Sequence, residues 1–340
     1  MMNTNNANKI KKEIPIFFAS DDNYVPFLVV AIDSMLKNAS KNYIYSIKVL
    51  TTGLCEESKI ALEKFVSNDV SVEIVDVTEA MKSLSDQLHT RDYYSKSTYF
   101  RLFIPRLYPQ YKKAIYLDAD IVVTGDISKM FNINIGNNLV GAVPDGAVQA
   151  TPVFIEYVEK VLGVKGKKYF NAGILLMNLD QFRKQNFEQK FVELLGKYTF
   201  TVAQDQDYLN VICAGKVTYI DESWDKMPIP MGNCDPAKQN IIHYNMGWKP
   251  WHTDGVLFEE IFWNYAKQTQ MYEKILKIKE NYTPADLLRD QQQGAALLAM
   301  CRQEADSPVN YYNLYIKNSI SGNGEPADQD FDSEEIPAKV

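Results

Sequence analysis

Two carboxylates interrupt a largely apolar stretch of the sequence. Asp118 and Asp120 follow residues 114–117 and precede residues 121–123, none of which is charged. Burying a charge within such a strand is costly unless the charge is paired or binds a cation, and carboxylate oxygens are ligands that Mg²⁺ and Mn²⁺ prefer. The Asp-x-Asp tripeptide is common by chance, and a solvated loop pair is the alternative interpretation. The position of the pair within a strand favours a divalent metal site.

Polar residues also follow or precede two other predicted strands. Residues 21–23 (Asp-Asp-Asn) come directly after the first strand, where sheets of the nucleotide-binding kind hold their ligands; capping of the next helix is an equal alternative. Residues 169–173 (Tyr-Phe-Asn-Ala-Gly) lead into an apolar strand. Asn171 is suited to hydrogen-bond a hydroxyl-rich ligand and Gly173 permits close backbone approach, but a plain turn explains this stretch as well.

Two later segments carry further candidates. Residues 204–207 (Gln-Asp-Gln-Asp) begin a predicted helix, where one side chain is expected to cap the helix and the others are available for a polar site; a solvated first turn is the alternative. Residues 243–252 combine His243, a candidate metal ligand, with Lys249, a candidate phosphate ligand, and two tryptophans expected at the surface. A packed histidine is the alternative for His243. His252 is assigned a structural role, and His89 is assigned none.

Composition excludes several classes of protein. The chain has 340 residues, of which 46% are hydrophobic and 23% are charged, which is typical of a globular protein. Its net charge of −7 disfavours nucleic-acid binding. No apolar run reaches the 18–20 residues of a membrane span, and the first residues resemble no secretory signal. Four cysteines without a paired spacing indicate reduced thiols and a cytoplasmic location.

The elements that must position these candidates follow an α/β pattern. Predicted strands at 14–19, 44–50 and 70–77 alternate with predicted helices at 24–36 and 56–66. Such a βαβαβ order predicts a parallel sheet whose ligands lie beyond the carboxyl ends of the strands. There is no GxGxxG after the first strand, which disfavours a dinucleotide-binding protein. The sequence also has no GxxxxGK(S/T), which excludes a P-loop, and no GxSxG nucleophile elbow.

The rest of the chain predicts further elements. These are strands at 113–123, 139–143, 172–177 and 241–244, and helices at 98–107, 180–198, 204–214, 258–279 and 284–304. Residues after 319 are acidic with almost no apolar anchors, which predicts disorder. The expected organisation is a flexible N-terminus (1–13), one α/β domain (14–265), a helical C-terminal extension (266–318) and a disordered acidic tail (319–340).

Six ordered blocks carry a resemblance to a known family. They are FFASDDNYV, STYFRLFIP, AIYLDADIVV, YFNAGILLMNL, QDQDYLN and IIHYN…KPWH. Their order resembles glycosyltransferase family 8, which includes bacterial lipopolysaccharide galactosyl- and glucosyltransferases and the glycogenins. The resemblance covers about two thirds of the chain. It implies the GT-A fold, a Rossmann-like α/β mixed sheet flanked by helices, here with the helical extension.

The resemblance also implies roles for single residues. Those implied to bind the UDP-sugar donor are Ala19, Asp21, Asn23, Tyr24, Thr98, Arg101, Ala119, Asp145, Asn171, Gly173, Asp205, Gln206, Gly247 and Lys249. Those implied to ligate Mn²⁺, or Mg²⁺ in its place, are Asp118, Asp120 and His243. One departure concerns the phosphate contact. Met246 stands three residues after His243, where the family has glycine, and Gly247 follows it.

The implied activity is metal-dependent, retaining transfer of glucose or galactose from a UDP-sugar to a saccharide or lipid-linked saccharide, with an α-linked product. Same-face attack with Asp205 and Gln206 steadying the cation is favoured over double displacement, since an amide is a poor nucleophile. A nucleotide-sugar-binding or stress-response protein and a self-glucosylating enzyme are the rivals. Aromatic and basic residues at 271–279 and 311–317 suit peripheral contact with the inner face of the cell membrane, although a packed helix is favoured.

Overall fold

The computed structural model describes residues 11–82, 88 and 96–317. The strands are β1 (Lys12–Ala19), β2 (Tyr43–Thr51), β3 (Val70–Asp76), β4 (Ala114–Leu117), β5 (Ile121–Val123), β6 (Val140–Ala142), β7 (Ile174–Met177), β8 (Val217–Tyr219) and β9 (Ile241–His243). The helices of the first half are α1 (Val25–Asn38), α2 (Glu56–Glu63), α3 (Thr78–Met81), α4 (Ile104–Leu107), α5 (Ile127–Phe131), α6 (Gly146–Ala150) and α7 (Pro152–Lys160). Those of the second half are α8 (Leu179–Lys184), α9 (Phe187–Leu195), α10 (Asp205–Ile212), α11 (Glu259–Ala266), α12 (Tyr272–Asn281) and α13 (Pro284–Asp306).

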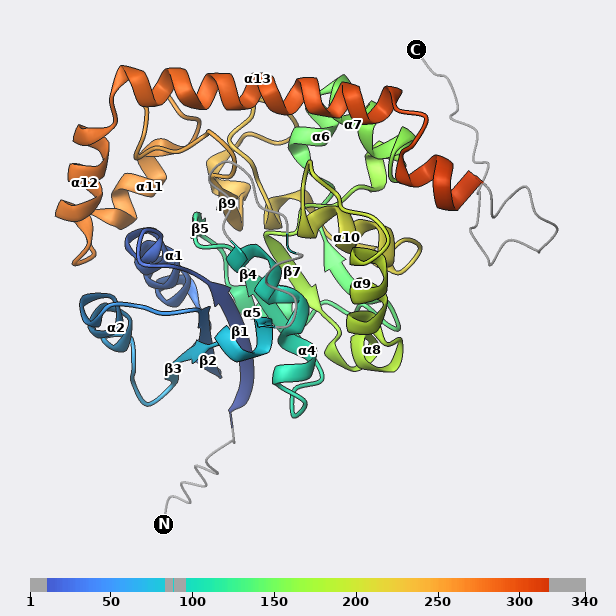
Figure 1. Ribbon diagram of the computed structural model, residues 1–340. Helices are drawn as coiled ribbons and strands as arrows, with labels where there is room; N and C mark the ends of the chain where they lie inside the picture. Colours follow the sequence, from blue (N-terminus) through green and yellow to red (C-terminus); the bar gives the residue numbers. More distant parts are fainter. Residues whose placement is uncertain (1–10, 83–87, 89–95, 318–340) are drawn as a thin grey trace, which may run out of the picture.

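Within the described part of the chain, seven strands form the central sheet in the order β3-β2-β1-β4-β7-β6-β8. Strands β1 to β4 pair in parallel, as the βαβαβ pattern predicts, while β7 runs antiparallel to both β4 and β6. The predicted α/β fold with a mixed sheet flanked by helices is therefore confirmed (Figure 1).

The prediction of one strand over 113–123 is wrong. The chain leaves the central sheet after Leu117, bends at Ala119 and Asp120, and enters a second sheet in which β5 pairs antiparallel with β9. The two carboxylates stand at this bend because a strand that continued through them would carry their charges within a sheet flanked by core. The apolar residues on either side of the bend thus belong to different sheets.

Three helix predictions also need correction. Residues Lys96–Phe103 form a 3₁₀ helix before α4, rather than one α-helix. The predicted helix 180–198 is divided into α8 and α9 at Asn186, whose φ of 51° is left-handed, a conformation that asparagine adopts more readily than most residues. The predicted helix 258–279 is divided into α11 and α12. Apolar periodicity continues through such short breaks, which is why it did not indicate them.

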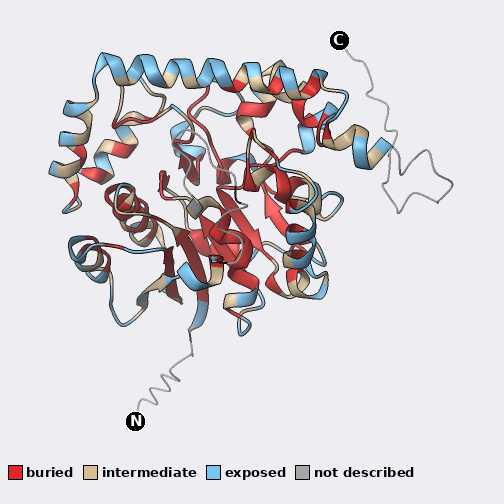
Figure 2. Cartoon of the chain, in the orientation of Figure 1, coloured by how far each residue is buried: buried red, intermediate tan, exposed pale blue. Residues whose placement is uncertain are grey.

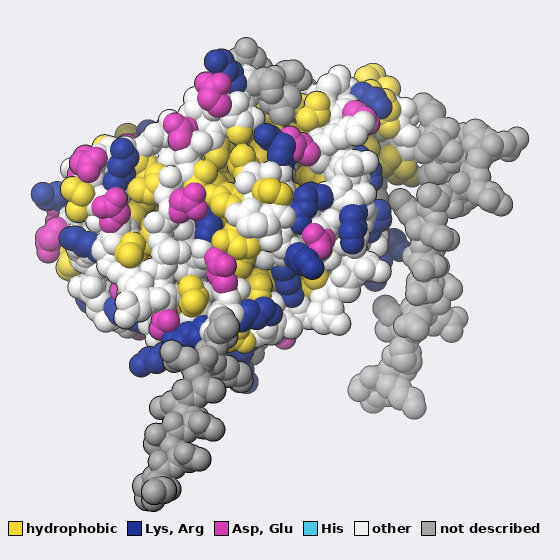
Figure 3. All heavy atoms as spheres, turned by 90° about the horizontal axis from the view of Figure 1, so that it is seen from below, with side chains coloured by type: hydrophobic (Ala, Val, Ile, Leu, Met, Phe, Trp, Pro, Cys, Tyr) yellow, Lys and Arg dark blue, Asp and Glu magenta, His cyan; other side chains and the backbone are white. Residues whose placement is uncertain are grey.

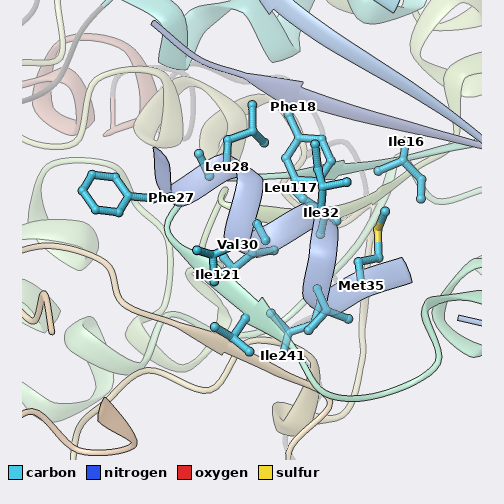
Figure 4. Close-up of a cluster of buried hydrophobic side chains, with 14 of the residues drawn as sticks. Ile16, Phe18, Phe27, Leu28, Val30, Ile32, Met35, Leu117, Ile121 and Ile241 are labelled. Carbon is cyan, nitrogen blue, oxygen red and sulfur yellow. The ribbon is translucent and has the colours of Figure 1, made fainter. Parts of the chain in front are cut away.

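Core side chains cover both faces of the central sheet. Ile16 and Phe18 of β1 belong to the cluster beneath α1, whereas Phe17, between them, belongs to the cluster on the opposite face, as the two-residue period of a strand requires. Figure 4 shows Leu28 and Ile32 of α1 in the first of these clusters. The buried residues concentrate in the sheet and the surfaces that pack on it (Figure 2), so the strand ends that carry the candidate residues are held by core on both sides.

Helix α13 crosses one end of the molecule, from α12 to α7 (Figure 1). It begins with a capping box between Thr283 and Asp286. Its first half is largely exposed, whereas Leu297, Cys301 and Ala305 of its second half are buried.

None of the helices in the described residues is long and apolar enough to cross a membrane. The face seen from below carries acidic and basic side chains intermixed (Figure 3).

The expectation that both tryptophans of residues 243–252 lie at the surface is wrong for Trp251. Its side chain is 1% exposed and stacks on Phe27 of α1, with the ring centroids 3.9 Å apart. It also packs against Phe262 of α11 at 4.8 Å. Trp251 therefore fixes the loop after β9 to the core, whereas Trp248 is half-buried.

We predict that Trp251→Ala lowers the free energy of unfolding by about 3–5 kcal/mol, because it leaves a cavity between α1 and α11. Urea unfolding followed by fluorescence and circular dichroism measures this change. Leu288→Ala is the matched control: Leu288 is 54% exposed, so its loss is expected to change the free energy by no more than about 0.5 kcal/mol. Equal unfolding midpoints for the two variants would contradict the packing role of Trp251.

Candidate functional site

The small β5–β9 sheet brings a late histidine to the bend after β4. Ile121 pairs with His243 in the antiparallel register, and the backbone N–H of Tyr244 donates to the carbonyl of Asp120 at 2.9 Å. The N–H of Asp118 donates to the carbonyl of Gly173 at 2.7 Å. As a result, one ligand atom from each of Asp118, Asp120 and His243 lies within 4.8 Å of the others.

The imidazole of His243 is oriented by a carboxylate that the sequence did not indicate. Nδ1 of His243 lies 2.9 Å from Oδ1 of Asp225, and Nε2 lies 3.3 Å from Oδ1 of Asp120. Asp225 is buried beside β9, because the N–H of Lys226 donates to the carbonyl of Ile241. A carboxylate behind a metal-binding histidine fixes the tautomer and the direction of the ring. Its loop position, with no motif around it, gave no sequence signal.

The charge state of this histidine depends on its carboxylates. Burial alone would lower the pKa of the His243 imidazole, but Asp225 and Asp120 outweigh burial and raise the pKa to about 10. The ring is therefore protonated near neutral pH when no cation is bound. A divalent cation that binds at Nε2 has to displace this proton.

Gly173 allows the side chains of His243 and Asp118 to approach the backbone closely. A Cβ at this position would lie 2.4 Å from Cε1 of His243 and 2.6 Å from Oδ2 of Asp118. Such separations are far inside van der Waals contact, so no side chain fits. The glycine predicted from the sequence is thus required by close approach.

The three residues fit a divalent cation. Nε2 of His243 is buried, lies 3.3 Å from Oδ1 of Asp120 and makes no well-directed hydrogen bond within the described part of the structure, so it is suited to bind a cation. Two carboxylates and one imidazole form a donor set suited to Mn²⁺, with Mg²⁺ preferring oxygen alone. The prediction of a metal site at Asp118, Asp120 and His243 agrees with this geometry.

Arg101 connects the metal-site carboxylates to the start of α10. Its guanidinium lies 3.4 Å from Oδ1 of Asp118 and 2.9 Å from Oδ2 of Asp205. It also donates to the carbonyls of Thr98 and Ala172. Burial raises the pKa of the Asp205 carboxyl to about 7, although Arg101 acts in the opposite direction.

The amide of Gln206 is held at both ends. Its Nε2 donates to Oδ2 of Asp145 at 3.0 Å, and its Oε1 accepts from the N–H of Ala172 at 2.8 Å. Asn171 donates to the same Asp145 oxygen at 3.0 Å. Asp145 is in turn fixed as the N-cap of α6, where it accepts from the N–H of Val148. These polar side chains therefore form one ordered wall.

Asp207 belongs to the interior, although it neighbours two candidate residues. It accepts hydrogen bonds from the hydroxyls of Tyr157 at 2.8 Å and Tyr169 at 2.7 Å, and from the N–H of Ala203 at 3.0 Å. It is fully buried. The expectation that a side chain of residues 204–207 caps the helix is wrong, since the N-cap Gln204 makes no side-chain capping bond; Asp207 is buried, while Asp205 and Gln206 face the site.

Two pockets meet at the metal-site carboxylates. We call them the inner pocket, lined by Arg101, Asp145, Asn171, Gly173, Asp205, Gln206 and His243, and the outer pocket, lined by Ala19, Asp21, Tyr24, Tyr116 and Ala119. Thr98, Asp118 and Asp120 line both. A ligand with two parts would therefore place its junction at the metal-site carboxylates. The inner pocket also has an apolar side from α7 and α13, which includes Phe154, Val158 and Leu297 and which the sequence did not indicate.

Not every predicted residue lies in these pockets. Asn23, Gly247 and Lys249 line neither of the two, and Asn23 and Gly247 are exposed. Asp21 accepts hydrogen bonds from the N–H groups of Asn23 and Tyr24, so it caps the turn before α1 as well as facing the outer pocket. His89 lies outside the described residues.

Lys249 reaches the metal-site carboxylates from the loop after β9. Its ammonium contacts Oδ2 of Asp120, and the side chain is 3% exposed. The departure from the family pattern lies at Met246, three residues before Lys249. Met246 has a left-handed φ of 52°, whereas Gly247 does not have a positive φ. The conformation that glycine adopts freely is thus adopted here by Met246.

The family model named glycosyl transferase family 8 matches residues 15–255. The chain belongs to this family. A glycosyltransferase of Haemophilus influenzae is 33% identical over 245 residues, which cover 70% of this chain and 72% of that protein. The family resemblance predicted from six sequence blocks is therefore confirmed.

Two solved structures share the fold of this family 8 chain. The galactosyltransferase LgtC, solved in complex with donor and acceptor sugar analogs, has a TM-score of 0.63 and 26% identity over 76% of this chain and 96% of its own. The bifunctional glycosyltransferase WbbM has a TM-score of 0.69 and 28% identity over 79% of this chain. The present chain spans about half, 52%, of the WbbM chain.

We predict that Gly173→Ala abolishes binding of Mn²⁺ while the protein still folds, because the new methyl group would enter the space between His243 and Asp118. Isothermal titration with MnCl₂ measures the binding, and circular dichroism measures the fold. Gly294→Ala in α13 is the matched control, since its Cβ would meet no atom within 4 Å; it should bind Mn²⁺ normally and be as stable or more stable. Normal Mn²⁺ affinity in Gly173→Ala would show that the cation binds elsewhere.

Proposed function

We propose that this family 8 protein is a metal-dependent, retaining hexosyltransferase that uses UDP-glucose or UDP-galactose. The observation that carries the proposal is the meeting of two pockets at Asp118 and Asp120. In this proposal the uridine occupies the outer pocket and the hexose occupies the inner pocket. The diphosphate between them then lies beside the three residues that fit a cation.

Cleavage of the bond between the hexose and UDP leaves negative charge on the diphosphate. A divalent cation at Asp118, Asp120 and His243 would supply Lewis-acid stabilisation of that charge. Lys249, whose ammonium already contacts Asp120, adds a second positive group at the same place. Preorganised charges of this kind act where the charge develops and need no rearrangement during the reaction.

The same-face route is supported by the contacts of the two candidate catalytic residues. Asp205 is paired with Arg101 at 2.9 Å, which lowers its tendency to attack carbon. The amide of Gln206 is fixed by Ala172 and Asp145, and an amide is a weak nucleophile. Both residues are therefore proposed to stabilise the oxocarbenium-like sugar, while the acceptor hydroxyl attacks on the face that UDP leaves and yields an α-linked product.

The proposed acceptor is a saccharide or a lipid-linked saccharide at the cytoplasmic side of the cell membrane. The contacts of α12 support packing of this helix against the protein more than they support contact with that membrane. Ile275 of α12 is buried, Lys274 lies 3.2 Å from Glu57, and Lys279 lies 2.5 Å from Asp254. These lysines are thus paired within the protein.

We predict that Asp118→Ala and Asp120→Ala each abolish release of UDP from UDP-hexoses, because losing one of two carboxylates removes both charge and geometry from the cation site. His243→Ala should weaken activity less, since a metal-bound imidazole is neutral. A UDP-release assay over a panel of nucleotide sugars, with and without added saccharides, measures this. Asp254→Ala, at a side chain that is 90% exposed, is the control. Full activity in EDTA would refute metal dependence.

The same assay separates the rival functions. Binding of a nucleotide sugar without any turnover would support a binding or stress-response protein instead. Hexose adducts on the purified protein, detected by intact mass spectrometry, would support self-glucosylation. Transfer only in the presence of an added saccharide supports the proposed reaction.

We predict that Gln206→Ala lowers kcat by on the order of 10²-fold without abolishing activity, as expected for the loss of one preorganised polar group. Steady-state kinetics with the preferred UDP-hexose measures this. Under double displacement, a quenched reaction would instead leave a hexose on the peptide that contains Asp205 and Gln206. A β-linked product by NMR would contradict retention itself.

A further inference from the structure

A third pocket lies behind the loop that follows β9. We call it the α12–α13 pocket; it is bounded by Ile278, Tyr282, Arg289 and Gln293 of the two helices and their connection, and by Lys249 and His252 of the loop. Among the described residues that line the inner pocket and the α12–α13 pocket, Met246 is the only one common to both. Met246 therefore borders both of these spaces.

The backbone at this residue is held in an unusual conformation. Met246 has a φ of 52°, in the left-handed region that residues with a Cβ avoid. A non-glycine residue persists there only when its surroundings stabilise it more than the conformation costs. The site thus keeps a side chain at a position where glycine would be free of strain.

Packing on two sides fixes the Met246 side chain in place. It is half-buried and packs against the large cluster that includes Phe154 of α7 at its edge. It also packs against the small cluster of Ala147, Met227 and Ile229. An unbranched thioether fills an irregular gap of this kind well.

We propose that Met246 closes the inner pocket against water from the α12–α13 pocket, so that the hexose is transferred to the acceptor rather than hydrolysed. The inference rests on the proposed hexosyltransferase function. In the reaction that Met246 suppresses, the bond between the anomeric carbon and the diphosphate oxygen breaks, and its electron pair leaves with UDP. The oxygen of water forms the new bond to carbon and releases one proton to solvent. Exclusion of water from a reactive sugar is a general requirement of transfer.

The test compares three substitutions with UDP-galactose or UDP-glucose as the only substrate. Met246→Gly and Met246→Ala should raise the rate of UDP release by about tenfold, because both remove the partition that excludes water, while the donor KM changes little. Met246→Leu retains the bulk and should behave as the wild type does. Asn186→Gly is the control for relief of left-handed backbone strain, since Asn186 has a φ of 51° and is exposed between α8 and α9. It should leave the rate of UDP release unchanged.

Melting temperatures provide a readout that does not need activity. Met246→Gly should melt at a higher temperature than Met246→Ala, because both lose the same packing and only glycine relieves the left-handed backbone. Elsewhere alanine usually gives the more stable protein of the two, so a higher melting temperature for Met246→Gly would be the reverse of the usual order.

The outcomes distinguish the inference from the function on which it rests. Wild-type hydrolysis with no increase in Met246→Gly or Met246→Ala would overturn the partition role and leave the hexosyltransferase intact. Transfer to an added saccharide with no donor hydrolysis in Met246→Gly or Met246→Ala would likewise overturn the partition role alone. Absence of UDP release from wild type and variants alike, with every nucleotide sugar and with added saccharides, would overturn the proposed function and the partition role together. A tenfold rise confined to the two small substitutions supports the proposal.

Discussion

The arrangement of the rest of the molecule depends on the pairing of charged side chains in the partly buried region at the bend after β4. Four carboxylates lie there: Asp118, Asp120, Asp205 and Asp225. Three groups offset them: Arg101, Lys249 and protonated His243. Charges removed from water are tolerated only when they are paired and hydrogen-bonded. Because the pKa of the Asp205 carboxyl is raised to about 7, these charges nearly balance near neutral pH. The two carboxylates and the imidazole at the bend after β4 are the donors that favour a divalent cation.

Pairing these charges requires segments that are far apart in the chain. The carboxylates of the bend, the guanidinium from the 3₁₀ segment and the imidazole of β9 come together because the central sheet ends where the β5–β9 sheet begins. Gly173 allows His243 and Asp118 to lie close to the backbone at the start of β7. Trp251 then fixes the loop that carries Lys249 to α1, so the core and the charged region are stabilised by the same loop.

Much of this arrangement could be predicted from the sequence, for identifiable reasons. The first three strands have local apolar patterns that predict them. The placement of Asp118 and Asp120 within an apolar run predicts a cation site, because charges there need a partner. The division of residues 113–123 between two sheets could not be predicted, because it depends on pairing with β9, more than a hundred residues later. Asp225 was missed for the same reason: its partner is defined by a long-range register, not by a spacing. Met246 was noticed as a departure, but its left-handed backbone is visible only in three dimensions.

The place of His243 and α13 late in the chain has a consequence for synthesis on the ribosome. Domains fold from the N-terminal side as the chain emerges at about 5–20 residues per second, so roughly ten seconds separate the appearance of Asp118 from that of His243. During that interval the paired strands of the first half can form, while the carboxylates at the bend lack their imidazole partner. The inner pocket gains its Leu297 wall later still. The residues that would hold a cation are thus all present only after His243 has been synthesised, and those that line the inner pocket only after Leu297.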